Sequence, residues 1–155
     1  MKRPQIYVDT SVFGGCFDAE FATWSNALMA DFREGRLRLV VSDVTAAEIA
    51  LAPELIRELF SELLPLSTFL EVGGDALELL TAYETHSVLG PRFRNDMLHI
   101  AVATVGEVDV VVSWNFKHIV RLDKIQLFNG INIELGYRPL AIYSPREVAT
   151  YGRED

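Results

Sequence analysis

The pattern of hydrophobic and polar positions along the chain alternates between two periods. Short apolar runs rich in β-branched residues predict strands at 5–8, 38–41, 69–72, 108–112, 131–135 and 140–143. Apolar residues at helical spacing predict helices at 23–34, 46–51, 55–63, 75–86 and 95–105, and a short helix is expected near 144–147. Because strands and helices alternate with short connections, the chain is predicted to fold as an α/β protein with a parallel sheet between helices.

Local signals add detail to this prediction. Gly14 and Gly15 predict a flexible loop at 13–17, directly after the first strand. Asn95 is a favourable N-cap for the helix at 95–105. Thr45 lies three residues before Glu48, which is the spacing of a capping box at the start of a helix.

Composition limits the size and setting of the protein. The 155 residues, half of them hydrophobic, are enough for one domain with a real core, spanning 1–155. The apolar runs are too short to cross a membrane, no signal peptide is evident, and Cys16 is the single cysteine, so a cytoplasmic protein is expected. The formal charge of −8 argues against tight nonspecific binding to nucleic acid. It leaves open binding through metal ions or a few local arginines.

Polar residues occur where strands should end and helices should begin. Asp9 ends the first strand, Glu48 follows the second strand in a helix, and Asp96 opens a later helix. Ser113 and Asn115 follow the strand at 108–112. The carboxyl ends of parallel strands and the amino ends of the next helices share one edge of an α/β sheet, so these side chains are expected to converge.

Each acid also has a purely structural explanation. Asp9 can start a turn, Glu48 can complete the capping box with Thr45, and Asp96 can complement a helix dipole. The set is more informative than its members, because three carboxylates on one edge repel each other and need a counter-charge. Mg²⁺ or Mn²⁺, which prefer oxygen ligands, would supply it. The histidines and Cys16 lack the spacing of a zinc site.

Four segments that follow each other along nearly the whole chain carry a family resemblance. They are Tyr7-Val8-Asp9-Thr10-Ser11, Thr45-x-x-Glu48-Ile49, Asn95-Asp96-x-x-His99-Ile100-Ala101-x-Ala103 and Val112-Ser113-Trp114-Asn115-Phe116-Lys117-His118-Ile119. In this order they resemble the motifs of PIN-domain proteins, and most closely the VapC-type toxins of bacterial toxin–antitoxin pairs. The resemblance implies a three-layer α/β/α PIN-like fold with a central parallel sheet of about five strands.

The resemblance also implies an Mg²⁺- or Mn²⁺-dependent endoribonuclease that hydrolyses RNA with a metal-activated water. Carried over by position, Asp9, Glu48 and Asp96 match the metal-binding acids of the family, and Asn115 falls at the fourth acidic position. An amide oxygen can ligate a metal but adds no negative charge, so the sequence departs from the commonest pattern there. Ser113 can hold a metal-bound water, or it can simply form a turn at the strand end.

Other polar residues allow two interpretations each. His99 lies one turn after Asp96, where it can orient the acids or pack in the core. Arg92 and Arg94 can bind RNA beside the acids or can be ordinary solvated side chains.

The resemblance further implies a small antitoxin protein as partner and a homodimer formed by the helical region at 55–63. The apolar stripe of that helix can equally pack on the sheet. The alternative function is a catalytically weakened PIN-like module that binds RNA or protein without cutting, since Asn115 replaces an acid. Metal titration combined with cleavage of RNA would separate the two functions.

Overall fold

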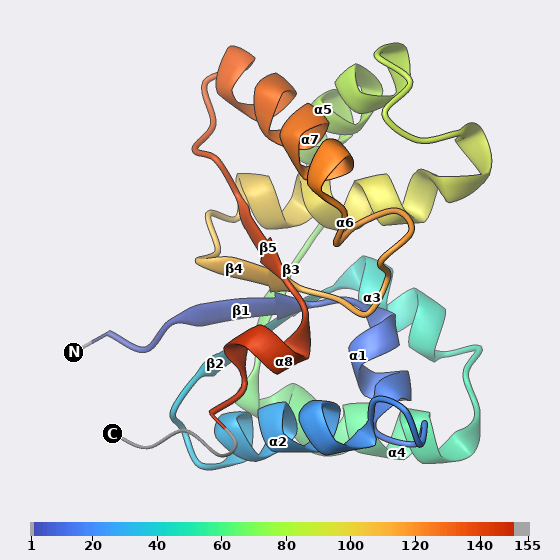
Figure 1. Ribbon diagram of the computed structural model, residues 1–155, viewed down its shortest axis with the longest axis vertical. Helices are drawn as coiled ribbons and strands as arrows, with labels where there is room; N and C mark the ends of the chain where they lie inside the picture. The colour runs from blue at the N-terminus through green and yellow to red at the C-terminus, as the bar shows by residue number, and fades with distance from the viewer. Residues whose placement is uncertain (1, 151–155) are drawn as a thin grey trace.

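A parallel sheet runs through the middle of the molecule (Figure 1). The computed structural model describes residues 2–150. The sheet has five strands in the spatial order β3-β2-β1-β4-β5, and every neighbouring pair is parallel. Their bounds are β1 (Gln5–Val8), β2 (Arg38–Ser42), β3 (Thr68–Leu70), β4 (Val110–Val112) and β5 (Ala141–Tyr143). The strand order reverses direction at β1, so the β1–β4 boundary is the topological switch point of the sheet.

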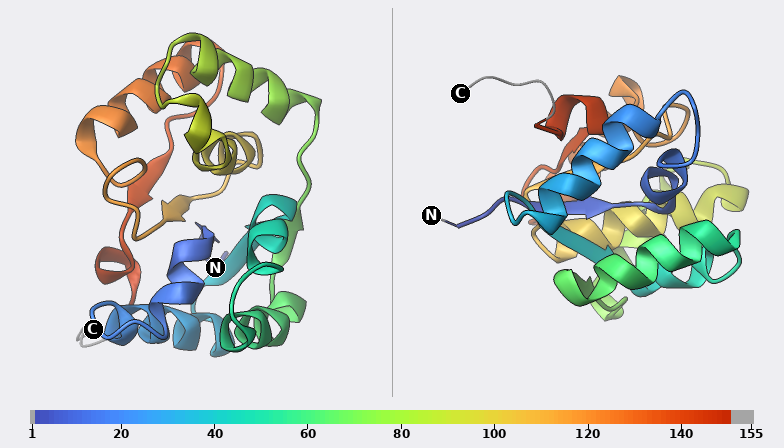
Figure 2. Two further views of the ribbon diagram at one scale, coloured as in Figure 1. Left: turned by 90° about the vertical axis from the view of Figure 1, so that its right-hand side faces the viewer. Right: turned by 90° about the horizontal axis from the view of Figure 1, so that it is seen from below.

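Helices cover both faces of this sheet (Figures 1 and 2). Tyr7 of β1 points into the half of the core that is closed by α5, α6 and α7, whereas Ile6 and Val8 point to the half closed by α1, α2, α4 and α8. The helices are α1 (Thr10–Gly15), α2 (Ala22–Arg33), α3 (Asp43–Ile49), α4 (Glu54–Leu63), α5 (Gly74–Thr85), α6 (Arg94–Val105), α7 (Leu122–Glu134) and α8 (Pro145–Val148), with 3₁₀ turns at Leu64–Leu66 and Pro91–Phe93.

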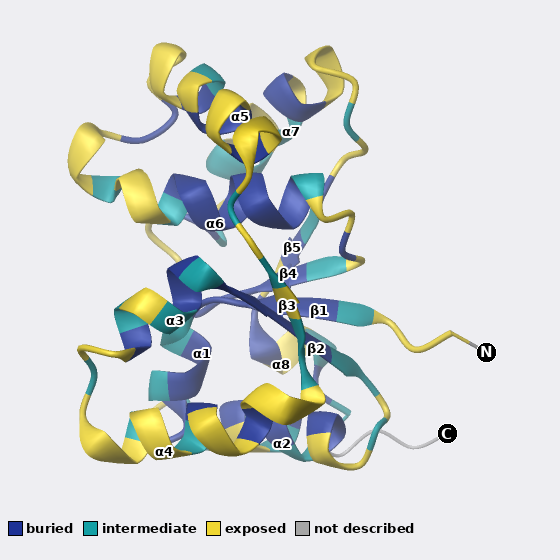
Figure 3. Cartoon of the chain, turned by 180° about the vertical axis from the view of Figure 1, so that it is seen from behind, coloured by how far each residue is buried: buried dark blue, intermediate teal, exposed yellow. Residues whose placement is uncertain are grey.

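Burial follows this three-layer arrangement, as Figure 3 shows. The strands are mostly buried, and so is α6, which lies between the sheet and the outer helices α5 and α7. The predicted α/β/α fold with a parallel sheet of five strands is therefore confirmed. No helix in the described range is both long enough and apolar enough to cross a membrane.

Two predicted elements are wrong. Residues 13–17 do not form a flexible loop, because Thr10–Gly15 is helical and Val12 and Phe13 are buried. The strand predicted at 131–135 is instead the end of α7. Its buried residues Phe128, Ile131 and Asn132 recur at helical spacing, and the Tyr83 hydroxyl donates to the Asn132 side chain. The apolar residues at 131–135 therefore continue a helical pattern that began before them.

Two predicted caps are also wrong. Ser42, and not Thr45, is the N-cap of α3, since its hydroxyl accepts a hydrogen bond from the Val44 N–H at 3.2 Å. Thr45 lies inside α3 and is fully buried. Helix α6 begins at Arg94, so Asn95 lies within the helix and does not cap it.

The apolar stripe of α4 packs largely on the protein's own core. Phe60 and Leu63 are buried, Ile56 and Leu59 are half-buried, and Leu55 alone among the five is exposed. Packing on the core thus accounts for most of the stripe, as the simpler interpretation held. The homodimer stays a prediction.

Gly15 provides a test of how α1 docks on the core. A Cβ atom at this position would lie 2.5 Å from Ser25 Oγ and 2.6 Å from Trp114 Nε1, two atoms that are hydrogen-bonded to each other at 2.8 Å. We expect Gly15→Ala to lower the free energy of unfolding by about 1–3 kcal/mol, because the new methyl group overpacks this contact.

Gly14→Ala is the matched control in the same helix, since its Cβ would meet only Ile56 Cδ1, at 3.8 Å. It should leave stability unchanged or raise it by up to about 1 kcal/mol through helix propensity. Urea unfolding of both variants measures the difference. Equal unfolding free energies for the two variants would contradict the prediction, because they would show that α1 can move away from Trp114 without losing stability.

Candidate active site

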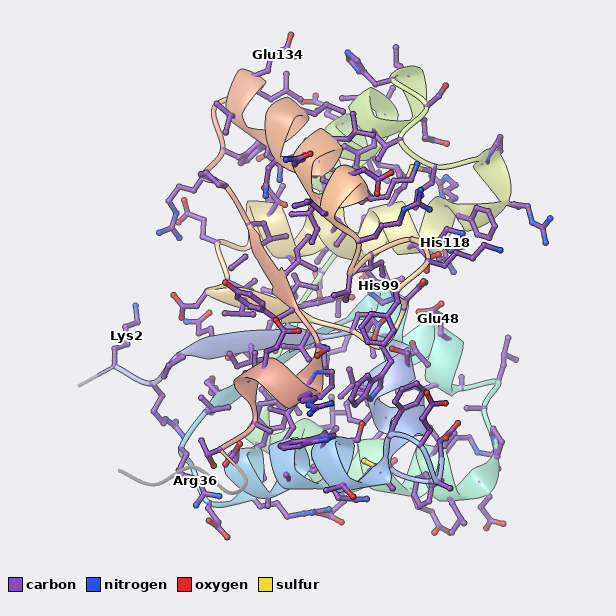
Figure 4. The ribbon with its side chains drawn as sticks, in the orientation of Figure 1. Lys2, Arg36, Glu48, His99, His118 and Glu134 are labelled. Carbon is purple, nitrogen blue, oxygen red and sulfur yellow. The ribbon has the colours of Figure 1, made fainter. Side chains whose placement is uncertain are left out.

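The carboxyl edge of the sheet brings the predicted site residues together. Asp9 follows β1 and Ser113 follows the neighbouring strand β4, and the Ser113 hydroxyl donates to Asp9 Oδ2 at 2.7 Å. Glu48 lies in the second turn of α3 and Asp96 in the first turn of α6. Figure 4 shows Glu48 beside His99, on the side of the molecule opposite Lys2.

Asp9 is enclosed by two hydroxyl groups. Its side chain is buried, and Ser11 Oγ donates to Oδ1 at 2.6 Å while Ser113 Oγ donates to Oδ2. The same hydroxyl oxygens accept the backbone N–H groups of Trp114 and Asn115, each at 2.9 Å. Because those N–H groups can only donate, they direct the serine protons toward the carboxylate.

A second chain of hydrogen bonds leads from Glu48 into the core. Glu48 Oε1 accepts from Thr10 Oγ1 at 2.8 Å and lies 2.5 Å from His99 Nε2. His99 is buried, and its Nδ1 lies 2.6 Å from the Tyr7 hydroxyl, which lies 2.8 Å from Ser42 Oγ. Both ring nitrogens of His99 therefore have polar partners. His99 therefore orients Glu48 and does not simply pack in the core.

The charges in this chain stabilise one another. Burial by itself lowers the pKa of the His99 imidazole, but Tyr7, Glu48 and Asp9 outweigh burial and raise it to about 10. Burial raises the pKa of Glu48, but the hydrogen bonds from His99, Thr10 and Asn95 outweigh it, so this pKa lies below its ordinary value. At neutral pH the two side chains thus form an imidazolium–carboxylate ion pair.

Asp9 and Asp96 are less easily ionised than Glu48. Burial is the main cause that raises the pKa of Asp9, and the charge of Glu48 adds to it against the opposing effects of His99, Ser11 and Ser113. Burial and Glu48 likewise raise the pKa of Asp96. The acids are therefore close enough to repel one another, as the sequence predicted.

Asn115 is near the acids, but its amide has a defined orientation. Its Oδ1 accepts the backbone N–H of His118 at 2.9 Å, and its Nδ2 lies 3.4 Å from Asp96 Oδ2. Since a backbone N–H can only donate, the amide oxygen is fixed toward His118 and the amide N–H₂ faces Asp96. The predicted role of Asn115 as a ligand through its oxygen would require this amide to turn.

The donor chemistry at this edge fits a hard divalent cation. Carboxylates, hydroxyls and one amide meet there, and burial together with the charge of Glu48 raises the pKa values of Asp9 and Asp96. Within residues 2–150, however, no three His, Cys, Asp or Glu side chains already stand in a ligating arrangement. The hydroxyls and His99 occupy carboxylate oxygens that a metal would take, so a cation would have to replace some of these hydrogen bonds.

Sequence reasoning missed Tyr7 and Ser42, which anchor the far end of the hydrogen-bond chain. The available signal was the position of Tyr7, two residues before Asp9 and therefore on the same face of β1. A tyrosine buried in a central strand needs a partner for its hydroxyl. The buried Tyr7 hydroxyl therefore predicts a polar group beneath the acids, but the sequence does not show that this group is His99.

No protein-family model and no curated protein matches this sequence. Solved structures do share its fold, among them two crystal structures. The crystal structure of VapBC2 from Rickettsia felis, bound to a DNA fragment from their promoter, gives a TM-score of 0.58 at 12% identity and covers 90% of this chain and 98% of that chain. The crystal structure of FitAcB from Neisseria gonorrhoeae gives 0.59 at 16% identity and covers 92% and 99%.

At such low identities the likeness concerns the fold. It extends over nine-tenths of this chain and almost all of each compared chain, so it includes the sheet and the helices on both faces. The PIN-like fold expected from the order of the four sequence motifs is thus confirmed by comparison as well as by strand topology. The chain has the fold of the VapBC2 and FitAcB chains that it matches.

Proposed function

We propose that this protein is a metal-dependent endoribonuclease, the toxin of a toxin–antitoxin pair, which hydrolyses RNA phosphodiester bonds at Asp9, Glu48 and Asp96. The observation that carries the proposal is the convergence of these three acids, from three separate segments, at the switch point of a PIN-like sheet. Because the carboxylates repel one another, such a cluster does not stabilise the fold. Its oxygen atoms are suitable ligands for a divalent cation, which would offset the repulsion.

The residues would divide the work as follows. Asp9, Glu48 and Asp96 would hold Mg²⁺ or Mn²⁺, which when bound supplies an activated water and offsets charge on the scissile phosphate. Ser11 and Ser113 keep Asp9 in one orientation. His99 does the same for Glu48. All three are positioning residues, since they act through the acids.

The compared structures support a protein partner. VapBC2 and FitAcB are toxin–antitoxin complexes, and this chain matches almost the full length of one chain in each. A small antitoxin that covers the acidic centre until it is removed would fit the proposed activity.

One observation favours the alternative of a binding module without catalysis. In the described range the acids are hydrogen-bonded to protein groups and no ready metal-ligating group is present. Asn115 also removes the charge that an acid would add. Cleavage of an RNA pool that depends on Mn²⁺ would decide for the enzyme, and metal-independent binding without cleavage would decide for the module.

The assignment of the acids is tested by Asp9→Asn. We expect this variant to lower Mn²⁺-dependent cleavage of RNA by more than about a hundredfold. Loss of a residue that only orients a metal ligand already costs up to about a hundredfold, and Asp9 is proposed to be a ligand itself. The fold should remain, with an unfolding free energy within about 1.5 kcal/mol of wild type, because the amide still hydrogen-bonds to serine hydroxyls.

Asp18→Asn, an exposed substitution in the turn after α1, should leave cleavage unchanged. Gel-resolved cleavage of a labelled RNA pool, with circular dichroism on the same samples, makes the measurement. Full activity in pure Asp9→Asn protein would refute the assignment of the site.

The place of Asn115 in the site is tested by Asn115→Asp. One carboxylate oxygen can keep the His118 N–H, and the other would face Asp96 and add a negative charge beside the acids. We expect Mn²⁺ affinity to rise about tenfold or more, corresponding to one to a few kcal/mol in a partly solvated site.

Gln126→Glu is the matched control, because it adds the same charge at an exposed position of α7. Calorimetric Mn²⁺ titration compares the two variants with wild type. Equal affinities in all three proteins would place Asn115 outside the metal site.

A further inference from the structure

A cavity of about 400 Å³ opens directly beside the acidic centre. One wall carries Glu48 and Asp96, which belong to that centre. The other wall comes from the 3₁₀ turn Pro91–Phe93 and the start of α6. The lining residues are Glu48, Arg92, Phe93, Arg94, Asn95 and Asp96. The cavity is therefore polar, and it carries both signs of charge.

The two arginines of this cavity carry charges that no carboxylate of the described residues neutralises. Within residues 2–150, neither guanidinium group forms an ion pair, whereas Arg33, Arg36 and Arg121 each contact a carboxylate. Both Arg92 and Arg94 are exposed. In a chain with a net charge of −8, two unpaired cations next to a group of acids are available for an anionic ligand.

Arg92 is also held in place relative to the acids. Its guanidinium carbon lies 5.2 Å from the centre of the Phe93 ring, and the Phe93 ring packs on the His118 ring with centroids 3.8 Å apart. His118 Nδ1 lies 3.4 Å from Asp96 Oδ2. This stack links the arginine to the acidic centre through successive contacts, so its cationic group lies close to the proposed point of cleavage.

We propose that this cavity is an RNA subsite, in which Arg92 and Arg94 bind the phosphate that adjoins the scissile phosphate. The proposal rests on the ribonuclease function proposed above and names how its substrate is held. The planar guanidinium fork matches the geometry of phosphate oxygens. A phosphodiester carries a single negative charge, so it can lie on the arginine side of the cavity while the strand continues to the acids.

The same features argue against a free polyanion as the ligand. Glu48 and Asp96 would repel a multiply charged small molecule that filled the cavity. An RNA strand instead passes the arginines with one phosphate and reaches the acidic centre with the next. An acidic peptide from a protein partner would use the same arginines, and the experiment below separates it from RNA.

The first test measures binding without cleavage. Arg92→Gln/Arg94→Gln is compared with its parent in the inactive Asp9→Asn background, by fluorescence anisotropy with a short labelled single-stranded RNA. We expect the affinity at low salt to fall about tenfold, and the slope of log K against log salt to shrink by about 0.7, which corresponds to one lost phosphate contact on a single strand.

Arg3→Gln/Arg57→Gln in the same background is the matched control. Both residues are exposed and neither lines the cavity, and the variant loses the same two charges. It should reduce affinity far less. Equal losses in the two double variants would overturn the subsite, because general charge would then explain the effect, and an acidic peptide would become the better candidate for these arginines.

The second test places the subsite next to the scissile bond. With Asp9 restored, Arg92→Gln/Arg94→Gln should lower kcat/KM on a tetranucleotide, mainly through KM, but should leave kcat/KM unchanged on a dinucleotide that has only the scissile phosphate. An equal loss on both substrates would overturn the proposed position.

The two tests also separate this proposal from the one it rests on. RNA binding that depends on the arginine pair, in a protein that never cleaves RNA, would support the subsite and refute the hydrolysis. RNA cleavage that does not depend on the arginine pair would support the hydrolysis and refute the subsite.

Discussion

The candidate site depends on one ion pair, between the buried His99 imidazolium and the half-buried Glu48 carboxylate at 2.5 Å. Three acids cannot be gathered at one sheet edge without a compensating charge, because each carboxylate raises the cost of ionising the others. His99 supplies part of that charge from beneath, through contact with Glu48 and through its effect on Asp9 and Asp96. The fold therefore carries one cation of its own at the place where the proposed metal would add another.

The ion pair can exist because the core provides a polar path to it. Tyr7 projects from the central strand into the core half closed by α6, where its hydroxyl meets His99 Nδ1 and Ser42 Oγ. The imidazolium thus keeps a hydrogen-bond partner on each ring nitrogen although His99 is buried. Its folded pKa of about 10 exceeds the unfolded value of 6.5. Protonated His99 therefore stabilises the fold fully below pH 6.5, and this contribution is lost as the pH rises through 10.

Chain direction explains why so much of the site could be predicted from sequence. In a parallel sheet every strand ends at the same edge, so residues that follow strands, such as Asp9 and Ser113, must meet whatever the loop details. The features that were missed depend on contacts between distant segments. Gly15 lies in helix α1 directly against Trp114, and the Asn115 amide is oriented by the His118 N–H. Neither contact leaves a periodic signal in the sequence.

Nitrogen NMR of the His99 ring in metal-free protein is the most direct test of this account, with the signal assigned by its absence in His99→Gln. The account predicts that both ring nitrogens are protonated at pH 8, between the unfolded pKa of 6.5 and the folded value of about 10. A neutral imidazole at that pH, with one nitrogen bare, would contradict it. The acids would then be held together without an internal cation.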